Sequence, residues 1–296
     1  MDTSSTTLFN NLSMANMTQK PWNAFGECEE WKAGILYSIS VEILISVLGL
    51  PINVMVLQIL LSNTSDSSTT DIFIFNLAVL DAFFSILVLL DFLNLFLFNK
   101  ENIWYIQQFC YGLKDMGGPL LLCCICLDRY MAVLHPITFT RFKDRKYKIV
   151  CIILLWVIVL IYSIAKVFIR TENFERTFTT EILSAFIFLV FCNISILRAL
   201  TQSGPGRDEM HPVKKKAFRM VRCILAIIMF NYLPPVVLFP FQDYFAPAVF
   251  KCYIEPIAFS FLDFSSCTQP LLYLSRAKKI PCLPESDCLP SCSTSQ

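Results

Sequence analysis

Nine ionisable side chains interrupt otherwise apolar stretches of this 296-residue sequence, and its chemistry is expected there. A charged side chain surrounded by hydrocarbon costs at least about 2.5 kcal/mol, so each one needs a partner, a polar cavity or access to water. Asp81 and Asp263 lie nearest the middle of their stretches, which favours a functional role. Those nearer the ends, among them Lys114, Lys166 and Glu255, are explained equally well by reaching the surrounding water. The nine are Glu42, Asp81, Asp91, Lys114, Asp115, Arg129, Lys166, Glu255 and Asp263.

Metal-dependent catalysis and nucleic-acid binding do not fit the residue inventory. A catalytic metal site needs clustered histidines and acids, and the only histidines are His135 and His211, both in predicted loops. We therefore expect no metal site and no enzyme. The net charge of +1 argues against binding nucleic acid through bulk electrostatics.

The composition indicates a membrane protein, since 55% of the residues are hydrophobic and only 16% are charged. A soluble domain has about 25% charged residues. A helix needs about 20 mostly apolar residues to cross a bilayer. Seven stretches qualify, and prolines in the last two are interpreted as kinks. They are 34–61, 71–98, 104–134, 149–169, 181–200, 217–240 and 251–275.

The sequence thus predicts an all-α bundle of seven transmembrane helices. The bundle occupies residues 34–275, between an N-terminal tail at 1–33 and a C-terminal tail at 276–296. The third stretch is the least clear, because its first half contains Gln107, Gln108 and two charged residues.

The distribution of basic residues predicts the orientation. Lysines and arginines concentrate after the third stretch, before the sixth and after the seventh. Such loops stay in the cytoplasm, so the N-terminus is expected outside the cell and the C-terminus inside. The basic residues are Arg141, Lys143, Arg145, Lys146 and Lys148, then Arg207, Lys214, Lys215, Lys216 and Arg219, then Arg276, Lys278 and Lys279.

Modification motifs in the two tails agree with this orientation. Asn11 and Asn16 begin glycosylation sequons in the N-terminal tail. Cys282, Cys288 and Cys292 in the C-terminal tail are candidates for palmitoylation. Residues 1–30 contain no apolar core of a signal peptide, so the first stretch is expected to direct membrane insertion.

A set of motifs in the right order resembles the rhodopsin-like (class A) G-protein-coupled receptors. Asp128-Arg129-Tyr130 ends the third stretch, and five further motifs are spread over residues 49–273. The first, Gly49-Leu-Pro-Ile-Asn53, is similar to the branch of nucleotide, protease-activated, lipid and carboxylic-acid receptors. The residues that carry the other motifs are Leu77, Ala78, Asp81, Trp156, Leu233, Pro234, Pro270 and Tyr273.

The resemblance implies an activation switch at the cytoplasmic side. Arg129 would be held by Asp128 in the inactive receptor and released to contact the G protein. Pro234 would let the sixth helix swing outwards, while Tyr273 moves inwards. The full switch set is Asp128, Arg129, Tyr130, Pro234, Pro270 and Tyr273.

The resemblance also implies a ligand pocket between the outer halves of helices three, five, six and seven. Acids outnumber bases there, which favours a cationic or peptide ligand, whereas the branch favours an anionic one; both remain open. The candidate pocket residues are Asp91, Lys114, Asp115, Lys166, Tyr232, Glu255 and Asp263.

A structural sodium ion and one disulfide follow from the same resemblance. Relatives supply a further sodium ligand from the third helix, but that position is Gly118 here, so sodium binding stays open. The expected disulfide joins Cys28 to Cys252, with a pairing of Cys110 to either as the alternative. The sodium-site candidates are Asn53, Asp81, Ser265 and Ser266.

The resemblance implies a multi-pass plasma-membrane receptor whose partners are a heterotrimeric G protein, an extracellular ligand of unknown class and membrane lipids. Departures from the family pattern leave alternatives open. The chain is either a diverged receptor with an unusual outer face or one that lacks segments of helices three to five. A receptor-like protein that binds without signalling is a further alternative, and a transporter using Asp81 and Asp263 is less favoured. The departing positions are Asn193, Asn231, Tyr232 and Gln269.

Overall fold

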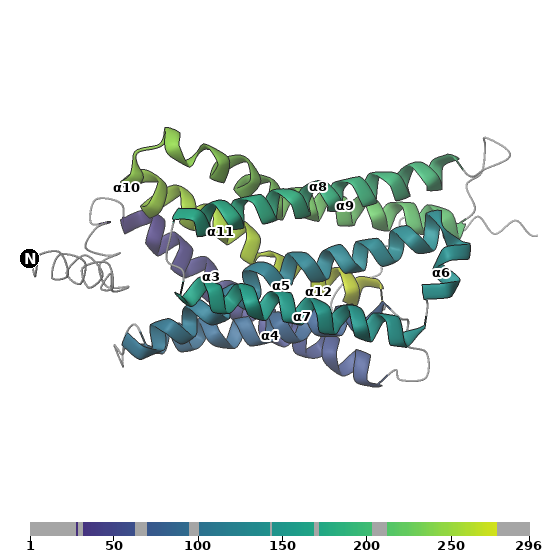
Figure 1. The fold of residues 1–296 in the computed structure, drawn as a ribbon, viewed down its shortest axis with the longest axis horizontal. Helices are drawn as coiled ribbons and strands as arrows, with labels where there is room; N and C mark the ends of the chain where they lie inside the picture. Colours follow the sequence, from purple (N-terminus) through teal and green to yellow (C-terminus); the bar gives the residue numbers. More distant parts are fainter. Residues whose placement is uncertain are drawn as a thin grey trace, which may run out of the picture.

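The computed structural model describes residue 28 and residues 32–62, 70–94, 101–142, 144–168, 172–202 and 212–276. These residues form long helices that run side by side along the long axis of the molecule (Figure 1). The predicted modification sites at Asn11, Asn16, Cys282, Cys288 and Cys292 lie outside the described residues.

Six of the described helices are long and apolar enough to cross a membrane. They are α3 (Lys32–Ser62), α4 (Asp71–Leu93), α5 (Glu101–Leu134), α7 (Arg145–Phe168), α8 (Glu172–Gln202) and α9 (Pro212–Leu238). Helix α5 continues through the polar half that made the third stretch the least clear. Helices α7 and α8 begin before the predicted 149 and 181, because a helix can continue with polar residues beyond the apolar core.

The seventh transmembrane segment is a chain of short helices instead of one long helix. After α9 come η3 (Phe239–Tyr244), α10 (Pro247–Val249) and η4 (Phe250–Ile254), followed by α11 (Glu255–Asp263) and α12 (Ser265–Arg276). The junction between α11 and α12 is held by hydrogen bonds from the Cys267 and Thr268 amides to the Phe264 carbonyl, at 3.1 and 3.0 Å. The seven-helix bundle is therefore present, with a jointed last member.

Helix α5 lies at the centre of the bundle. It packs against α4, α7 and α8, while α9 packs against α8 and α11, and α12 closes the ring against α3. The largest core cluster fills the space around α5 and includes Leu80, Leu121, Val159, Ile182 and Tyr232. The short helix α6 (Pro136–Phe142) follows α5 at one end of the bundle (Figure 1).

A disulfide joins Cys28 to Cys252, which is the pairing that the family resemblance implies. Their Cα atoms are 5.6 Å apart, within the usual range for a disulfide. Gly34 permits this arrangement, because a Cβ there would lie only 2.4 Å from the Cys252 carbonyl oxygen. The bond attaches Cys28 to η4, near the start of the seventh segment. Cys110 is instead buried against Phe84, Leu87 and Val88.

Helices α5 and α7 approach closely at Gly112, where a Cβ would lie 2.9 Å from the Ser163 Cα. We expect Gly112→Ala to force the two helices apart and to lower the free energy of unfolding by about 1–3 kcal/mol. Gly118→Ala on the same helix is the matched control, because its Cβ would meet only the Lys114 Nζ, at 3.9 Å. Thermal unfolding of the purified proteins in detergent measures both. Equal melting midpoints would contradict the close approach.

Candidate functional site

A buried ion pair lies in the middle of the bundle. The Asp81 side chain on α4 is fully buried, and its Oδ1 accepts hydrogen bonds from the Lys114 ammonium of α5 and from the Ser266 hydroxyl of α12, the latter at 3.1 Å. The Lys114 ammonium also donates to the Ser266 Oγ at 2.7 Å. Three helices therefore meet at one charged cluster. A buried acid and a buried base that form an ion pair offset the desolvation free energy that either charge would cost alone.

Asn53 connects α3 to the same cluster. Its side-chain amide donates to the carbonyls of Gly49 on its own helix and of Ser266 on α12, both at 3.0 Å. The spacing of four residues between Gly49 and Asn53 puts both groups on one helix face. Gly49 also lets α12 approach, since a Cβ there would be 3.3 Å from the Cys267 sulfur.

The sequence assigned Lys114 to the ligand pocket and missed its pairing with Asp81. The signal was available, because Lys114 precedes Gly118 by four residues and so lies on the same face of the helix. The family resemblance places Gly118 at the third-helix position of the sodium site that Asp81 would share. Lys114 lies one helical turn before Gly118, so it is a polar side chain close to that position on the same face.

A small cavity of about 30 Å³ lies beside this cluster, between α5, α8, α9 and α11. It brings together four predicted pocket residues, Lys114, Asp115, Tyr232 and Asp263, with two aromatic side chains, Phe178 and Phe259.

The other predicted pocket residues lie elsewhere. Lys166 on α7 forms an ion pair with Asp115 on α5, which places it at the edge of the cavity group. Glu255 lies in the first turn of α11 and does not line the cavity. The side chain of Asp91 lies outside the described part of the chain.

Glu181 on α8 is a further polar residue of this region that the sequence did not single out. It lies within electrostatic range of Asp115 and Lys166. Among the described residues, neither of its carboxylate oxygens has a hydrogen-bond partner. Glu181 is the first residue of the fifth apolar stretch, where a charged side chain can reach water and needs no buried role.

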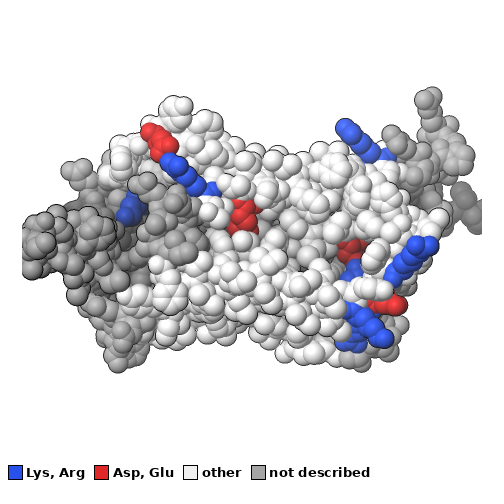
Figure 2. Space-filling view, in the orientation of Figure 1, with Lys and Arg blue, Asp and Glu red and all other residues white. Residues whose placement is uncertain are grey.

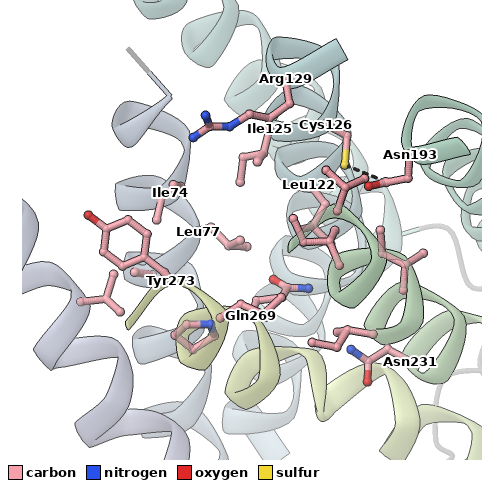
Figure 3. Close-up of a pocket in the computed structure, with 18 of the residues that line it drawn as sticks. Ile74, Leu77, Leu122, Ile125, Cys126, Arg129, Asn193, Asn231, Gln269 and Tyr273 are labelled. Carbon is pink, nitrogen blue, oxygen red and sulfur yellow. Dashed lines mark hydrogen bonds between the residues drawn. The ribbon is translucent and has the colours of Figure 1, made fainter. Parts of the chain in front are cut away.

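A larger cavity of about 240 Å³ opens between α3, α4, α5, α8, α9 and α12. In Figure 3 the Arg129 side chain extends from α5, Tyr273 lies across the cavity on α12, and Asn231 and Gln269 come from α9 and α12. Most of the remaining wall is apolar, including Leu77, Leu122 and Ile228.

Polar atoms on the wall of this cavity lack partners among the described residues. A buried polar group without a hydrogen bond is costly, and a cavity of this size has room for water to supply one. We therefore expect the cavity to be hydrated. The atoms are Asn53 Oδ1, Asp81 Oδ2, Arg129 Nε, Asn231 Oδ1 and Gln269 Oε1.

Residues that depart from the family pattern also line this cavity. The Asn231 amide donates to the Thr268 hydroxyl at 3.0 Å and so links α9 to α12. The Asn193 amide donates to the Leu189 carbonyl at 2.8 Å and to the Cys126 sulfur at 3.4 Å, the bond drawn in Figure 3. The departing residues thus line one cavity, and their hydrogen bonds link α9 to α12 and α8 to α5.

Asp128 makes a different ion pair from the one that the resemblance implied. Its carboxylate accepts hydrogen bonds from the Lys148 ammonium on α7 and from the Thr70 hydroxyl just before α4. Neighbouring residues on a helix point about 100° apart. Asp128 therefore faces α4 and α7, while Arg129 faces the cavity. The expected pair of Asp128 with Arg129 is replaced by the pair of Asp128 with Lys148.

The remaining switch residues are spread over the same half of the bundle. Pro270 and Tyr273 line the large cavity, and Pro234 lies inside α9. The Tyr130 ring contacts the rings of His135 and Phe191, with centroids 5.7 and 6.0 Å away. Trp156 on α7 donates to the Asn76 amide oxygen on α4 at 2.9 Å.

Six helices that can cross a membrane and a seventh, jointed segment pack around a buried charged cluster, as in a helical membrane protein. Residues 52–182 match the family described as 7 transmembrane receptor (rhodopsin family). Over these residues the chain resembles the rhodopsin family of seven-transmembrane receptors. The proteins that it resembles are receptors, and with its apolar helices the chain is a multi-pass protein of the plasma membrane.

Similar proteins include receptors for several kinds of ligand. The chain is 24% identical to mouse C-X-C chemokine receptor type 2 over 66% of its own length and 60% of that receptor. It is also 24% identical to human lysophosphatidic acid receptor 4, covering 81% of the chain and 73% of the relative. Human proteinase-activated receptor 3 is 24% identical, over 81% and 71%. The last two names agree with the branch that the Gly49–Asn53 motif resembled.

The pair of Lys148 with Asp128 provides a test of the site geometry. Lys148→Ala leaves the buried Asp128 carboxylate without its cation, and we expect a loss of about 3–5 kcal/mol of stability. Lys146→Ala is the control, because Lys146 is exposed two residues away and should change stability by less than about 0.5 kcal/mol. Thermal unfolding in detergent compares the two. Equal effects would mean that the Lys148 ammonium does not hold Asp128.

Proposed function

We propose that this protein senses an extracellular ligand and activates heterotrimeric G proteins. The observation that carries the proposal is the position of Arg129. Its guanidinium lines the large cavity, while the neighbouring Asp128 is neutralised by Lys148. Because Arg129 is not paired with Asp128, its guanidinium can bind the carbonyls or the carboxylate of a peptide segment that enters the cavity.

The arrangement of α9 supports a mechanism for opening the cavity. Pro234 and Pro235 both lie inside α9, where proline lacks the amide for a backbone hydrogen bond and weakens the helix locally. Three residues before Pro234, the Asn231 side chain is hydrogen-bonded to Thr268 on α12. The inner half of α9 can then swing away from α12 about the proline pair, which widens the cavity that holds Arg129. A ligand acts by binding one of the two conformations more tightly than the other.

We further propose that the ligand carries a positively charged group. Of the two lysines near the small cavity, Lys114 is paired with Asp81 and Lys166 with Asp115. Asp263 lines the cavity, and Glu181 lies beside Asp115 without a hydrogen-bond partner among the described residues. The local excess of acid favours a cationic or peptide ligand over an anionic one.

A receptor-like protein that binds without signalling is the second candidate. The observation in its favour is that Asn193, Tyr232 and Gln269 all line the large cavity, next to Arg129. These are three of the positions where the chain departs from the family pattern. Changed contacts there would alter the balance between the closed and open conformations.

We propose the orientation with the N-terminal tail 1–33 outside, the receptor domain at 34–275 and the tail 276–296 in the cytoplasm. Disulfides form in oxidising compartments, so the Cys28–Cys252 bond supports an extracellular location for that end. Figure 2 shows lysine and arginine side chains at both ends and a group of them at the end where α6 lies in Figure 1. The exposed Arg141 belongs to α6, and the exposed Arg145 and Lys146 begin α7, which follows α6 closely in the chain. Basic residues favour the cytoplasmic side.

Coupling tests the proposed function directly. We expect Arg129→Ala to abolish ligand-independent recruitment of G proteins while the chain still reaches the cell surface, because the variant removes the cation that faces the cavity. Arg145→Ala, which removes an exposed arginine at the same end, is the control and should keep recruitment. The measurement is recruitment of each G-protein class together with surface exposure of an N-terminal tag.

Two results would count against the proposal. Full recruitment by Arg129→Ala would mean that this side chain is not the coupling residue. A wild-type chain that is displayed at the surface but recruits no G protein above the Arg129→Ala background would favour the non-signalling alternative.

Glycosylation tests the orientation. The double variant Asn11→Gln with Asn16→Gln should lose the mobility shift that a glycosidase produces in the wild type, because both sequons are expected outside the cell. Asn63→Gln is the control: Asn63-Thr64-Ser65 is a third sequon, but it falls in a loop expected inside the cell, so this variant should leave the shift intact. A shift that depends on Asn63 alone would reverse the orientation.

A further inference from the structure

The family resemblance implies a sodium ion beside Asp81, and the residues present do not fit one. Asp81 Oδ1 and Ser266 Oγ are two of the expected ligand atoms, and both contact the Lys114 ammonium. The Asn53 amide is directed at backbone carbonyls through its nitrogen. The position that a metal cation would take between Asp81 and Ser266 is filled by a side chain of the protein.

We infer that the Lys114 ammonium is a built-in cation that takes the place of the sodium ion beside Asp81, so that this receptor does not respond to sodium. The ammonium carries the same single charge as sodium and donates to the same oxygens that would coordinate the metal. The Lys114 side chain is buried, and its Nζ lies 5.6 Å from the centre of the Phe84 ring, which adds a cation–π contact.

A second cation is disfavoured in the same place by electrostatics. The single charge of Asp81 is already balanced by Lys114, and like charges a few ångströms apart repel strongly where water is scarce. The neighbouring acids do not change this conclusion. Asp115 is paired with Lys166, and Asp263 lines the small cavity together with Lys114. The remaining acceptors, Asp81 Oδ2 and Asn53 Oδ1, face the large cavity, where water can satisfy them.

Covalent attachment changes what the cation does. A bound ion stabilises a conformation in proportion to the logarithm of its concentration, once that exceeds the dissociation constant. An ammonium attached to α5 is present at every salt composition. It also ties α5 to α4 through Asp81 and to α12 through Ser266. The contact between these helices is therefore a property of the sequence and not of the ionic environment.

The experiment compares thermal unfolding of the purified protein in sodium, potassium and choline chloride at one ionic strength. We expect the wild type to give the same midpoint in all three salts. Lys114→Asn removes the ammonium and supplies an amide oxygen, so it should gain a rise specific to sodium. The rise should be roughly 3–6 °C when sodium is in about tenfold excess over its dissociation constant.

Matched variants separate this effect from a general loss of charge. Lys166→Asn removes the lysine of a second, part-buried ion pair of α5 and should show no sodium-specific shift, because its partner is Asp115. Adding Asp81→Asn to Lys114→Asn should abolish the gained response. Lys114→Gln, which keeps more of the side-chain length, serves in place of Lys114→Asn if the latter does not fold.

Two outcomes would overturn the inference. A sodium-specific rise in the wild type would show that an ion binds despite Lys114, and this arm needs no variant. A folded Lys114→Asn or Lys114→Gln protein that is indifferent to sodium would show that the ammonium is not what takes the ion's place. Both outcomes concern stability alone, so neither depends on whether the chain couples to a G protein.

Discussion

The structure depends on one constraint, which is that charged groups inside the bundle must find their partners within the protein, because hydrocarbon supplies none. Asp81 meets Lys114, Asp115 meets Lys166, and Asp128 meets Lys148. Each pair joins two different helices. The ion pairs therefore hold α4, α5 and α7 in a particular arrangement, in addition to the apolar packing that a membrane protein gains from close contact.

Helix α5 contributes one residue to each of these pairs and lies at the centre of the bundle. Lys114 and Asp115 on this helix face different neighbours, as do Asp128 and Arg129. The rotation of about 100° per residue sends adjacent charges to different helices. Helix α5 thus connects the cluster around Asp81, the small cavity and the large cavity. A shift of α5 would change the contacts at all three.

Buried polar groups in proteins are usually hydrogen-bonded, and the large cavity is where this chain departs from that rule. Its wall holds buried polar atoms without partners among the described residues, and the positions that depart from the family pattern gather there. Such groups are costly in a fixed structure and useful where two conformations must be close in free energy. The neutralised Asp128 leaves Arg129 directed into this space. The physical asymmetry between a well-paired core and an incompletely paired cavity is what supports a switching function.

The sequence by itself determined the seven membrane segments, the resemblance to rhodopsin-like receptors and the need of Asp81 for a polar partner, because apolar length and local motifs are carried by neighbouring residues. It also indicated that Tyr232, Asp115 and Asp263 share one region. Only the tertiary structure showed that Lys114 pairs with Asp81, that Lys148 pairs with Asp128 and that Arg129 faces a cavity. The partners in these pairs are 33 and 20 residues apart. Which charges meet across such distances depends on how the helices rotate and pack against one another. The four-residue spacing put Lys114 on the same helix face as Gly118, but it did not determine which acid that face would meet.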